Sequence, residues 1–379
     1  MTTARQPAAT ETAQRDRPVG RPLLSARNIV QEFPVRGAGG LRGGIVHAVS
    51  DVSFDVHAGE TVGVVGETGS GKSTLARSLV QAPRPKSGEV HFQGSDLVRL
   101  RGRALVAARR HVQMVYQDPF GSLNPRWRVT ELVEEPLLGY GVKGAERRRR
   151  RVGELLDLVG LDPSVFGKRR PRELSGGQCQ RVAIARAIAL DPALVICDEA
   201  VSSLDVLIQA QVLNLFERLR SELGLSYVFI AHDLATVRQV SDRVAVMHLG
   251  QLAEVGPADA LYRAPLHPYT AALLASVPGL DPATGRARRP VPLRGEPPSP
   301  LDPPSGCRFR TRCPRAQARC ATEEPALQER AAGHSVSCHF PLDAPAHAGG
   351  EPRHLTRSAP DASAGPGGHL QVEPHAGPS

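Results

Sequence analysis

Residues 61–74 read Thr-Val-Gly-Val-Val-Gly-Glu-Thr-Gly-Ser-Gly-Lys-Ser-Thr, and no other stretch constrains the fold of this chain as strongly. The apolar residues from Val62 to Val65 have the composition of a short buried parallel strand. They lead directly into Gly66-x-x-x-x-Gly71-Lys72-Ser73, the pattern of a phosphate-binding loop. Residues 74–80 are then predicted to form a helix. Strand, loop and helix in this order predict an α/β fold that binds a nucleoside triphosphate.

The residue types in this loop suit a triphosphate with its Mg²⁺ ion. The glycines allow the backbone to turn sharply, so that successive N–H groups point into one concave nest around an anion. Lys72 is predicted to reach the β- and γ-phosphates, and the Ser73 hydroxyl is predicted to ligate Mg²⁺. The following helix directs its positive N-terminal end at the same phosphates. We expect every residue of the loop to bind the nucleotide: Gly66, Glu67, Thr68, Gly69, Ser70, Gly71, Lys72, Ser73 and Thr74.

Composition narrows the class of protein. The chain has 379 residues, of which 41% are hydrophobic, enough for a large α/β domain with extensions. The net charge of +9 comes partly from two basic runs, residues 147–151 and 168–170, which we interpret as solvated faces. Nucleic acid is therefore not expected as a partner. The chain shows no apolar run long enough to span a membrane and no secretory signal, so we expect it in the cytoplasm.

The chain divides into four segments. Residues 1–21 and 341–379 are polar or rich in Pro and Gly, and both are predicted to be disordered. Residues 22–278 carry the strand and helix patterns of one nucleotide-binding domain, in which alternation around Val52–Val56 indicates an antiparallel strand. Within it, about residues 130–180 show only helical periodicity and are predicted to be a helical subdomain. Residues 279–340 form an extension that contains four cysteines.

Several motifs follow the phosphate loop in a fixed order. They are Gln117, Leu174-Ser-Gly-Gly-Gln178, Cys197-Asp-Glu199, Ser203-Leu-Asp205 and His232. Together with the loop, this series resembles the ATP-binding cassette (ABC) ATPases over roughly residues 23–276. Smaller stretches are similar to the ATP-binding subunits of oligopeptide/dipeptide permeases: Tyr116–Arg126, Val201–Asp205, Ile208–Leu213 and His267–Thr270. Cys179 and Ala200 depart from the family pattern at positions that carry no chemistry.

The resemblance implies a fold and a function. The fold is that of an α/β P-loop NTPase, with a mixed sheet core, an antiparallel β subdomain and a helical subdomain. The function is hydrolysis of ATP to ADP and phosphate, which powers uptake of oligopeptides, dipeptides or related solutes at the cytoplasmic face of the cell membrane. The implied partners are a second ABC ATPase subunit (a homologous chain or a second copy), two integral membrane permease subunits and, indirectly, an extracytoplasmic solute-binding protein. The alternative is a soluble ABC-type ATPase of DNA repair, translation or metal-responsive regulation.

The motifs predict a further Mg²⁺ ligand, Asp198, and three catalytic residues. Asp198 ends an apolar strand, where it is placed to hold the Mg²⁺ shell. The resemblance implies that Glu199 is the general base and that His232 contacts the γ-phosphate. It also implies that Gln117 reaches Mg²⁺ or the attacking water. Glu199, His232 and Gln117 are therefore the predicted catalytic residues.

A second anion nest is predicted at Ser175, Gly176, Gly177 and Gln178, a glycine turn before a helix. In the family this turn caps the γ-phosphate held by a second subunit, and Asp205 belongs to a loop that communicates across the same interface. Adenine is expected to stack on an aromatic residue upstream of the phosphate loop, for which Phe33 is the candidate. The alternative for Phe33 is a place in the core.

The extension contains Cys307, Cys313, Cys320 and Cys338. Disulfides are not expected in a cytoplasmic protein, so an iron–sulfur cluster or a zinc ion is the sharper interpretation of four thiols. The resemblance to the peptide-permease subunits implies a [4Fe–4S] cluster. Cys179 and Cys197 lie in the cassette and are interpreted as ordinary small residues.

Overall fold

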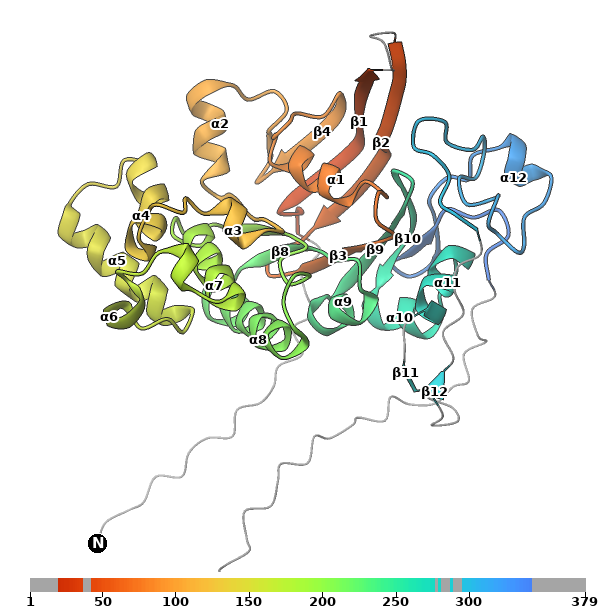
Figure 1. The fold of residues 1–379 in the computed structure, drawn as a ribbon. Helices are drawn as coiled ribbons and strands as arrows, with labels where there is room; N and C mark the ends of the chain where they lie inside the picture. The colour runs from red at the N-terminus through yellow and green to blue at the C-terminus, as the bar shows by residue number, and fades with distance from the viewer. Residues whose placement is uncertain (1–19, 37–41, 277–278, 281–286, 289–294, 343–379) are drawn as a thin grey trace, which may run out of the picture. The chain divides into compact units, whose positions relative to one another are not determined.

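The structure is a computed structural model that describes residues 20–36, 42–276, 279–280, 287–288 and 295–342. The predictions of disorder for residues 1–19 and 343–379 lie outside these residues. Two sheets dominate the fold, and helices cover them (Figure 1). A short pair of strands, β11 (Gly279–Leu280) and β12 (Ala287–Arg288), forms a third sheet.

The main sheet has eight strands in the order β13-β14-β10-β9-β3-β8-β7-β6. Every residue of the neighbouring strands β3, β8 and β7 is buried, as their apolar sequences require. Strand β3 pairs in parallel with β8 and β9, and β7 pairs in parallel with β6 and β8, whereas β10 runs antiparallel to β9. The predicted mixed sheet is thus confirmed. The strands are β3 (Thr61–Val65), β6 (Val112–Val115), β7 (Leu194–Asp198), β8 (Ser226–Ile230), β9 (Arg243–His248) and β10 (Gln251–Pro257).

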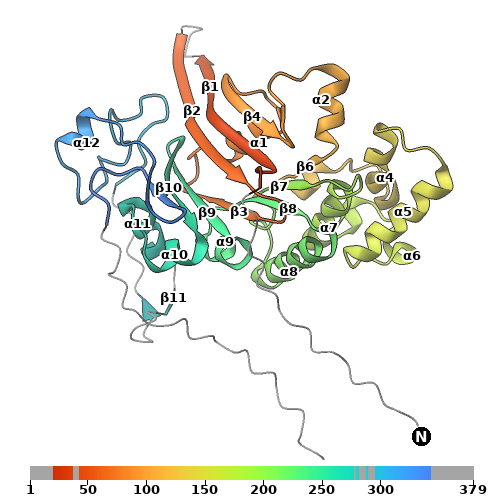
Figure 2. The same cartoon turned by 180° about the vertical axis from the view of Figure 1, so that it is seen from behind.

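The second sheet is antiparallel, as predicted. Its order is β2-β1-β4-β5, with β1 (Leu24–Arg36), β2 (Arg42–Val56), β4 (Ser87–Phe92) and β5 (Ser95–Asp96). Strands β1 and β2 form a long hairpin that rises away from the main sheet (Figure 2). Helix α1 (Lys72–Leu79) joins both sheets in one core, because Leu75 and Leu79 cluster with Val64 of β3 and Val52 of β2.

The helical subdomain that the resemblance implies is present, and its elements lie between β6 and β7. Helix α5 buries Val152, Leu155 and Leu156, whereas Arg147, Arg149 and Arg150 are exposed. Arg148 lies one turn before Val152 on the packed side and is half-buried, with its Nε 2.7 Å from Glu134 Oε1 of α4. Its elements are α3 (Pro119–Ser122), α4 (Val129–Gly139), α5 (Ala145–Leu158), α6 (Pro163–Phe166) and the 3₁₀ turn η2 (Pro171–Glu173). Helices α7 (Gly176–Ala187) and α8 (Val206–Leu223) pack it onto the sheet.

Besides the four-residue α3, two helices of the cassette are absent from the sequence prediction. They are α2 (Gly102–Arg109), which buries only Leu105, and α9 (Leu234–Val240), which has only seven residues. Elements this short, or with so little buried surface, have a weak helical period. The predicted helical stretch 257–276 appears as α10 (Ala258–Arg263) and α11 (Pro268–Ser276).

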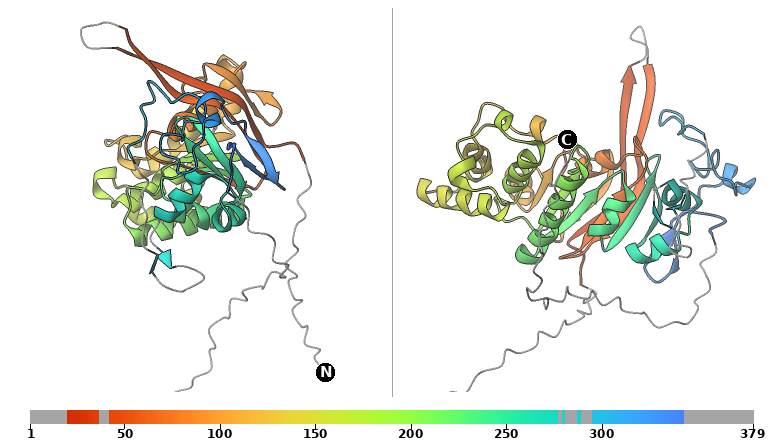
Figure 3. Two further views of the ribbon diagram at one scale, coloured as in Figure 1. Left: turned by 90° about the vertical axis from the view of Figure 1, so that its right-hand side faces the viewer. Right: turned by 60° about the horizontal axis from the view of Figure 1, so that its bottom comes forward.

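The cysteine-bearing extension continues the main sheet. Strand β14 (His334–Val336) pairs with β10, and β13 (Gln328–Ala331) pairs with β14; the helix α12 (Arg319–Thr322) precedes them. The extension and the helical subdomain lie on opposite sides of the central strands (Figure 3, right). The boundary predicted at residue 278 stays a prediction. Strand β14 belongs to the same sheet as β3, the strand that leads into the phosphate loop.

A buried carboxylate attaches this extension. Glu254 on β10 is fully buried, accepts hydrogen bonds from the backbone N–H groups of Leu266 (2.7 Å) and His267 (2.8 Å), and lies 2.7 Å from His334 Nε2 on β14. One side chain thus satisfies three buried polar groups from two segments. The attachment therefore depends on a residue that the sequence analysis does not single out.

Replacing Glu254 with Ala is expected to destabilise the protein strongly. Each buried donor left without an acceptor costs about 1–3 kcal/mol, so a total of roughly 3 kcal/mol or more is expected. Urea unfolding followed by circular dichroism measures the loss. The matched control is Glu324→Ala, because Glu324 is exposed and accepts from Gln251 Nε2 on the same strand. Equal unfolding midpoints for the two variants would contradict the role of Glu254.

Candidate functional site

The phosphate loop has the geometry of an anion nest. At Gly71, φ is +100° and an added Cβ would lie 2.0 Å from the carbonyl oxygen of Ala48, so only glycine fits there. Ser70 is buried, whereas Thr68 and Gly69 are exposed at the crest of the loop. The buried Lys72 donates from Nζ to the carbonyl oxygens of Gly66 (2.8 Å) and Glu67 (3.0 Å). The amine therefore lies across the mouth of the nest.

Charge and burial act in opposite directions on Lys72. Burial lowers the pKa of its amine, and the carboxylates of Glu199, Asp198 and Glu67 raise it. The amine is thus a poorly solvated cation whose hydrogen-bond acceptors are neutral oxygens. A triphosphate would supply the negative charge that such a cation lacks at close range.

Two predicted Mg²⁺ ligands lie next to each other. Ser73 Oγ donates a 2.7 Å hydrogen bond to Asp198 Oδ1, although the residues are 125 positions apart in the chain. Burial raises the pKa of Asp198 and the bond from Ser73 lowers it. A hydroxyl and a carboxylate are oxygen donors of the kind that Mg²⁺ prefers, so these two residues fit the ion.

The three predicted catalytic residues also converge. Gln117 Nε2 donates to Glu199 Oε2 at 2.9 Å, and His232 Nδ1 lies 3.8 Å from the same oxygen. Each residue follows a strand of the main sheet, β6, β7 or β8, and the carboxyl ends of parallel strands meet at one edge. Glu199 has a positive φ of +49°, a strained conformation for a residue with a side chain. The structure thus assembles a carboxylate, an amide and an imidazole beside the Mg²⁺ ligands.

The second predicted nest begins helix α7. Ser175 caps the helix: its Oγ accepts from the Gln178 N–H at 3.3 Å, and Gln178 Oε1 accepts from the Ser175 N–H at 3.0 Å. This capping box gives Gln178 a local structural role, which a Ser-x-x-Gln search could have found. An added Cβ at Gly177 would meet Ile208 Cγ2 at 2.4 Å, whereas at Gly176 the nearest atom, Leu204 Cδ2, is 3.5 Å away. Gly177 therefore serves the packing of α7 on α8, and Gly176 has room around it.

The two nests are not joined within this chain. In the described part of the chain, no hydrogen bond or ion pair connects the Ser175–Gln178 turn with the phosphate loop. Asp205 caps helix α8 by accepting from the Ile208 N–H at 3.0 Å. The next two residues, Val206 and Leu207, are 84% and 71% exposed. A strongly exposed apolar pair therefore stands beside the second nest.

Phe33 lies on β1 opposite Val46 and is 38% exposed. This exposure does not fit the alternative of a core residue. The ring remains a candidate for adenine stacking, and that role stays a prediction.

The four cysteines of the extension line one cavity of about 10 Å³. Burial raises the pKa values of the Cys307, Cys313 and Cys338 thiols, that of Cys338 to about 11, and neighbouring thiols raise them further. Among the described residues, however, no group of three or more His, Cys, Asp or Glu side chains is arranged to hold a metal ion. The cavity has the donor set of a thiolate-bound centre without its coordination geometry.

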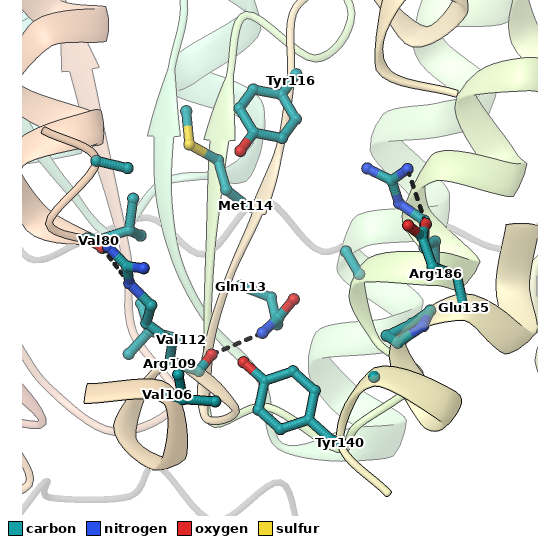
Figure 4. Close-up of a pocket in the computed structure, with 14 residues that line it drawn as sticks. Val80, Val106, Arg109, Val112, Gln113, Met114, Tyr116, Glu135, Tyr140 and Arg186 are labelled. Carbon is teal, nitrogen blue, oxygen red and sulfur yellow. Dashed lines mark hydrogen bonds and ion pairs between the residues drawn. The ribbon is translucent and has the colours of Figure 1, made fainter. Parts of the chain in front are cut away.

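A larger groove separates the core from the helical subdomain (Figure 4). Its volume is about 480 Å³, and it lies between α2 and β6 on one side and α4 and α7 on the other. Val106 and Tyr116 line it and are partly exposed, and an Arg186–Glu135 pair with a nitrogen–oxygen distance of 3.7 Å closes the far wall. Tyr116 directly precedes Gln117, one of the predicted catalytic residues. The sequence analysis does not predict this groove.

No helix among the described residues is long and apolar enough to cross a membrane.

The sequence of this chain is similar to two protein families and to individual transport proteins. Residues 49–202 match the model of the ABC transporter family, and residues 253–320 match that of the oligopeptide/dipeptide transporter C-terminal region. The chain is 48% identical to a probable peptide ABC transporter ATP-binding protein of Sinorhizobium fredii, over 89% of this chain and 93% of that protein. It is 50% identical to an oligopeptide transport ATP-binding protein, OppF, of Salmonella typhimurium, over 77% of this chain and 87% of that protein.

Solved structures of ABC transporter cassettes are also similar to this chain. The dimeric bacterial ABC transporter cassette MJ0796 superposes with a TM-score of 0.56 at 29% identity, covering 62% of this chain and 98% of that cassette. A post-hydrolysis state of the same cassette, a dimer bound to ADP and phosphate, superposes with a TM-score of 0.55. With the phosphate loop, the Glu199 cluster and the matched extension in one chain, this protein belongs to the ABC transporter family, as an ATP-hydrolysing subunit that carries the oligopeptide/dipeptide transporter C-terminal region.

Proposed function

We propose that this chain hydrolyses ATP to power the uptake of oligopeptides, dipeptides or related solutes. The observation that carries the proposal is the contact of Glu199 with both Gln117 and His232, beside the Ser73–Asp198 pair. The peptide class rests on the named relatives and on the matched extension. The alternative of a soluble ATPase outside transport is not favoured, because those relatives are transport subunits.

The residues divide the chemistry between them. The loop amides and Lys72 bind the β- and γ-phosphates, and Ser73 and Asp198 hold Mg²⁺, which neutralises charge on the phosphates. Glu199 accepts the proton of the attacking water, while Gln117 and His232 keep the carboxylate and the water in position. Phe33 stacks on the adenine.

In this proposal, a second subunit completes the ATP-binding site. Val206 and Leu207, which neighbour the Ser175–Gln178 nest, expose apolar surface that a second chain would cover. The dimeric state of the cassette MJ0796 supports this arrangement. The second subunit is a homologous chain or a second copy of this one.

Replacing Glu199 with Gln is expected to trap an ATP-bound dimer. The change removes the base but keeps size and hydrogen bonding, so hydrolysis should fall by about 10²–10⁴-fold. ATP then persists between the nests and holds the two subunits together. Size-exclusion chromatography with and without MgATP measures the dimer, with this chain alone and with a homologous subunit of the same transporter.

Gly176 supplies the matched test of the second nest. Its surroundings tolerate a side chain, and an Asp at the start of α7 favours the helix, so folding should survive. In the Glu199→Gln background, Gly176→Asp should abolish the dimer because a carboxylate would face the partner's γ-phosphate, whereas Gly176→Ala should weaken it much less. If the Gly176→Asp variant dimerises as well as its parent, the nest is not in the shared site.

The groove is proposed to receive a cytoplasmic segment of an integral membrane permease subunit, which would place this chain at the inner face of the membrane. A transporter subunit without a described membrane-spanning helix needs a membrane partner. The groove supports this role because it is large and partly apolar, and because Tyr116, which lines it, directly precedes Gln117 in the chain. Movement of a docked segment would thus reach Gln117 through Tyr116.

Val106→Asp is expected to abolish permease binding and to leave ATP binding unchanged. Val106 lines the groove and is 49% exposed, so a charge there opposes an apolar contact without disturbing the core. Val165→Asp is the matched control, because Val165 is 48% exposed on α6 outside the groove. Pull-down from detergent extracts of the native cell, with mass spectrometry of the retained polytopic subunits, compares the two. Equal recovery would contradict docking at the groove.

The cysteine cavity is proposed to hold a [4Fe–4S] cluster. The proposal is supported by the lining of one cavity by all four thiols, which would have to bind the cluster as thiolates.

Protein purified without oxygen is expected to be brown, with broad absorption at about 400 nm. Replacing Cys307, Cys313, Cys320 and Cys338 with Ser should remove the colour, while Cys179→Ala, which lies outside the cavity, should retain it. Elemental analysis separates the alternatives: zinc without iron favours the other metal, and the absence of both contradicts a metal centre.

A further inference from the structure

Glu67 is an unfavourable residue for an anion nest. It follows Gly66 directly and places a carboxylate beside the site proposed for a triphosphate. Its backbone carbonyl already accepts from Lys72 Nζ at 3.0 Å. Unless a cation offsets this carboxylate, it repels the phosphates and draws Lys72 away from them.

Arg312 of the extension supplies that cation. Its Nη1 donates to Glu67 Oε2 at 2.7 Å and its Nη2 donates to Glu67 Oε1 at 3.0 Å, a bidentate contact across 245 residues of sequence. The Arg312 side chain is only 4% exposed and that of Glu67 only 23%. Water therefore screens this pair little, and its electrostatic effect is larger than that of a surface pair.

The turn that carries Arg312 is held firmly. The Arg310 N–H donates to the Cys307 carbonyl and the Arg312 N–H donates to the Phe309 carbonyl, both at 3.0 Å. The buried Phe309 ring packs against Tyr269 and His248, with centroid distances of 5.2 and 5.4 Å. The guanidinium is thus delivered from a fixed position.

Tyr269 fixes the same loop residue from α11. Its hydroxyl oxygen accepts from the Glu67 N–H at 2.9 Å. Both the backbone and the side chain of Glu67 are therefore held by groups outside the phosphate loop. The residues from Ser70 onward can then keep their amides directed at the anion.

His248, a further basic group near Glu67, does not replace Arg312. His248 Nδ1 lies 3.9 Å from Glu67 Oε2, but burial lowers the pKa of His248 to about 4. The imidazole is therefore neutral at pH 7. Arg312 is the permanent cation in contact with this carboxylate.

We propose that Arg312 is a positioning residue for ATP, which neutralises Glu67 and, with Tyr269, holds the start of the phosphate loop. The proposal rests on the proposed function of that loop. It makes the ATP affinity of the cassette depend on a residue of the C-terminal extension. Arg312 acts through Glu67 and is not assigned a contact with ATP.

The test uses the full chain and titration calorimetry with MgAMP-PNP, together with steady-state ATPase kinetics. Arg312→Gln is expected to raise the dissociation constant by about tenfold or more, because an unneutralised carboxylate then faces the phosphates. KM for ATP should rise in parallel, and kcat should stay within about threefold because the groups around Glu199 do not move. Arg310→Gln is the matched control, since Arg310 lies on the same turn and donates to Ser305 instead.

A second-site variant separates charge from structure. Removing both charges in Glu67→Gln/Arg312→Gln should recover most of the affinity that Arg312→Gln loses, because no unneutralised carboxylate then faces the phosphates. Arg312→Lys keeps the charge and should stay within about threefold of the parent. The proposal is overturned if Arg312→Gln binds as the parent does, or if the double variant binds as weakly as Arg312→Gln.

If Arg312→Gln fails to fold, the double variant and Arg312→Lys carry the test, because neither leaves a buried charge unpaired. A tenfold loss in either then overturns the proposal. Lys72→Ala distinguishes a failure of the proposed ATP site from a failure of the proposed role of Arg312. If Lys72→Ala still binds MgAMP-PNP normally, the proposed ATP site itself is wrong; if it loses binding while Arg312→Gln does not, only the role of Arg312 fails.

Discussion

The parallel pairing of β3 with β8 and β9 is the constraint on which the rest of this structure depends. It buries every residue of β3 and thereby fixes where the chain emerges at Gly66. The same pairing scheme carries β7 and β6 alongside, so Asp198, Glu199 and Gln117 emerge at the same edge. Residues far apart in the sequence thus reach Ser73 and each other because of sheet register, not because of local sequence.

The β10 side of the main sheet explains how the C-terminal extension can influence the phosphate loop. Strand β14 adds to β10, and the buried Glu254 holds it there through His334. From that anchor, the turn containing Phe309 packs on Tyr269 and places Arg312 against Glu67. One sheet therefore carries the predicted catalytic groups at one side of β3 and the segments that contact Glu67 at the other.

Much of the cassette could be predicted from sequence, because its strands are apolar runs and its motifs have fixed order. Strands β3 and β7 and helix α8 follow from composition and period, and the catalytic cluster follows from the family's motif order. Helix α2 could not be predicted, since a helix that buries only Leu105 has almost no apolar face. Nor could the Arg312–Glu67 contact, because 245 residues of separation leave no local pattern. The capping box at Ser175 was predictable from its spacing alone.

The two glycines of the Ser175–Gln178 turn are under different constraints. At Gly177 the chain's own packing suffices as an explanation, since a Cβ would collide with Ile208 of α8. At Gly176 the nearest atom leaves room for a side chain, so nothing within this chain requires glycine there. Beside it stand Val206 and Leu207, which no neighbour in the described chain covers well. An open glycine at a helix N-terminus, next to exposed apolar surface, is what a surface needs when an anion arrives on another subunit. In the proposed shared site, the room at Gly176 is therefore available to a phosphate that the second subunit holds.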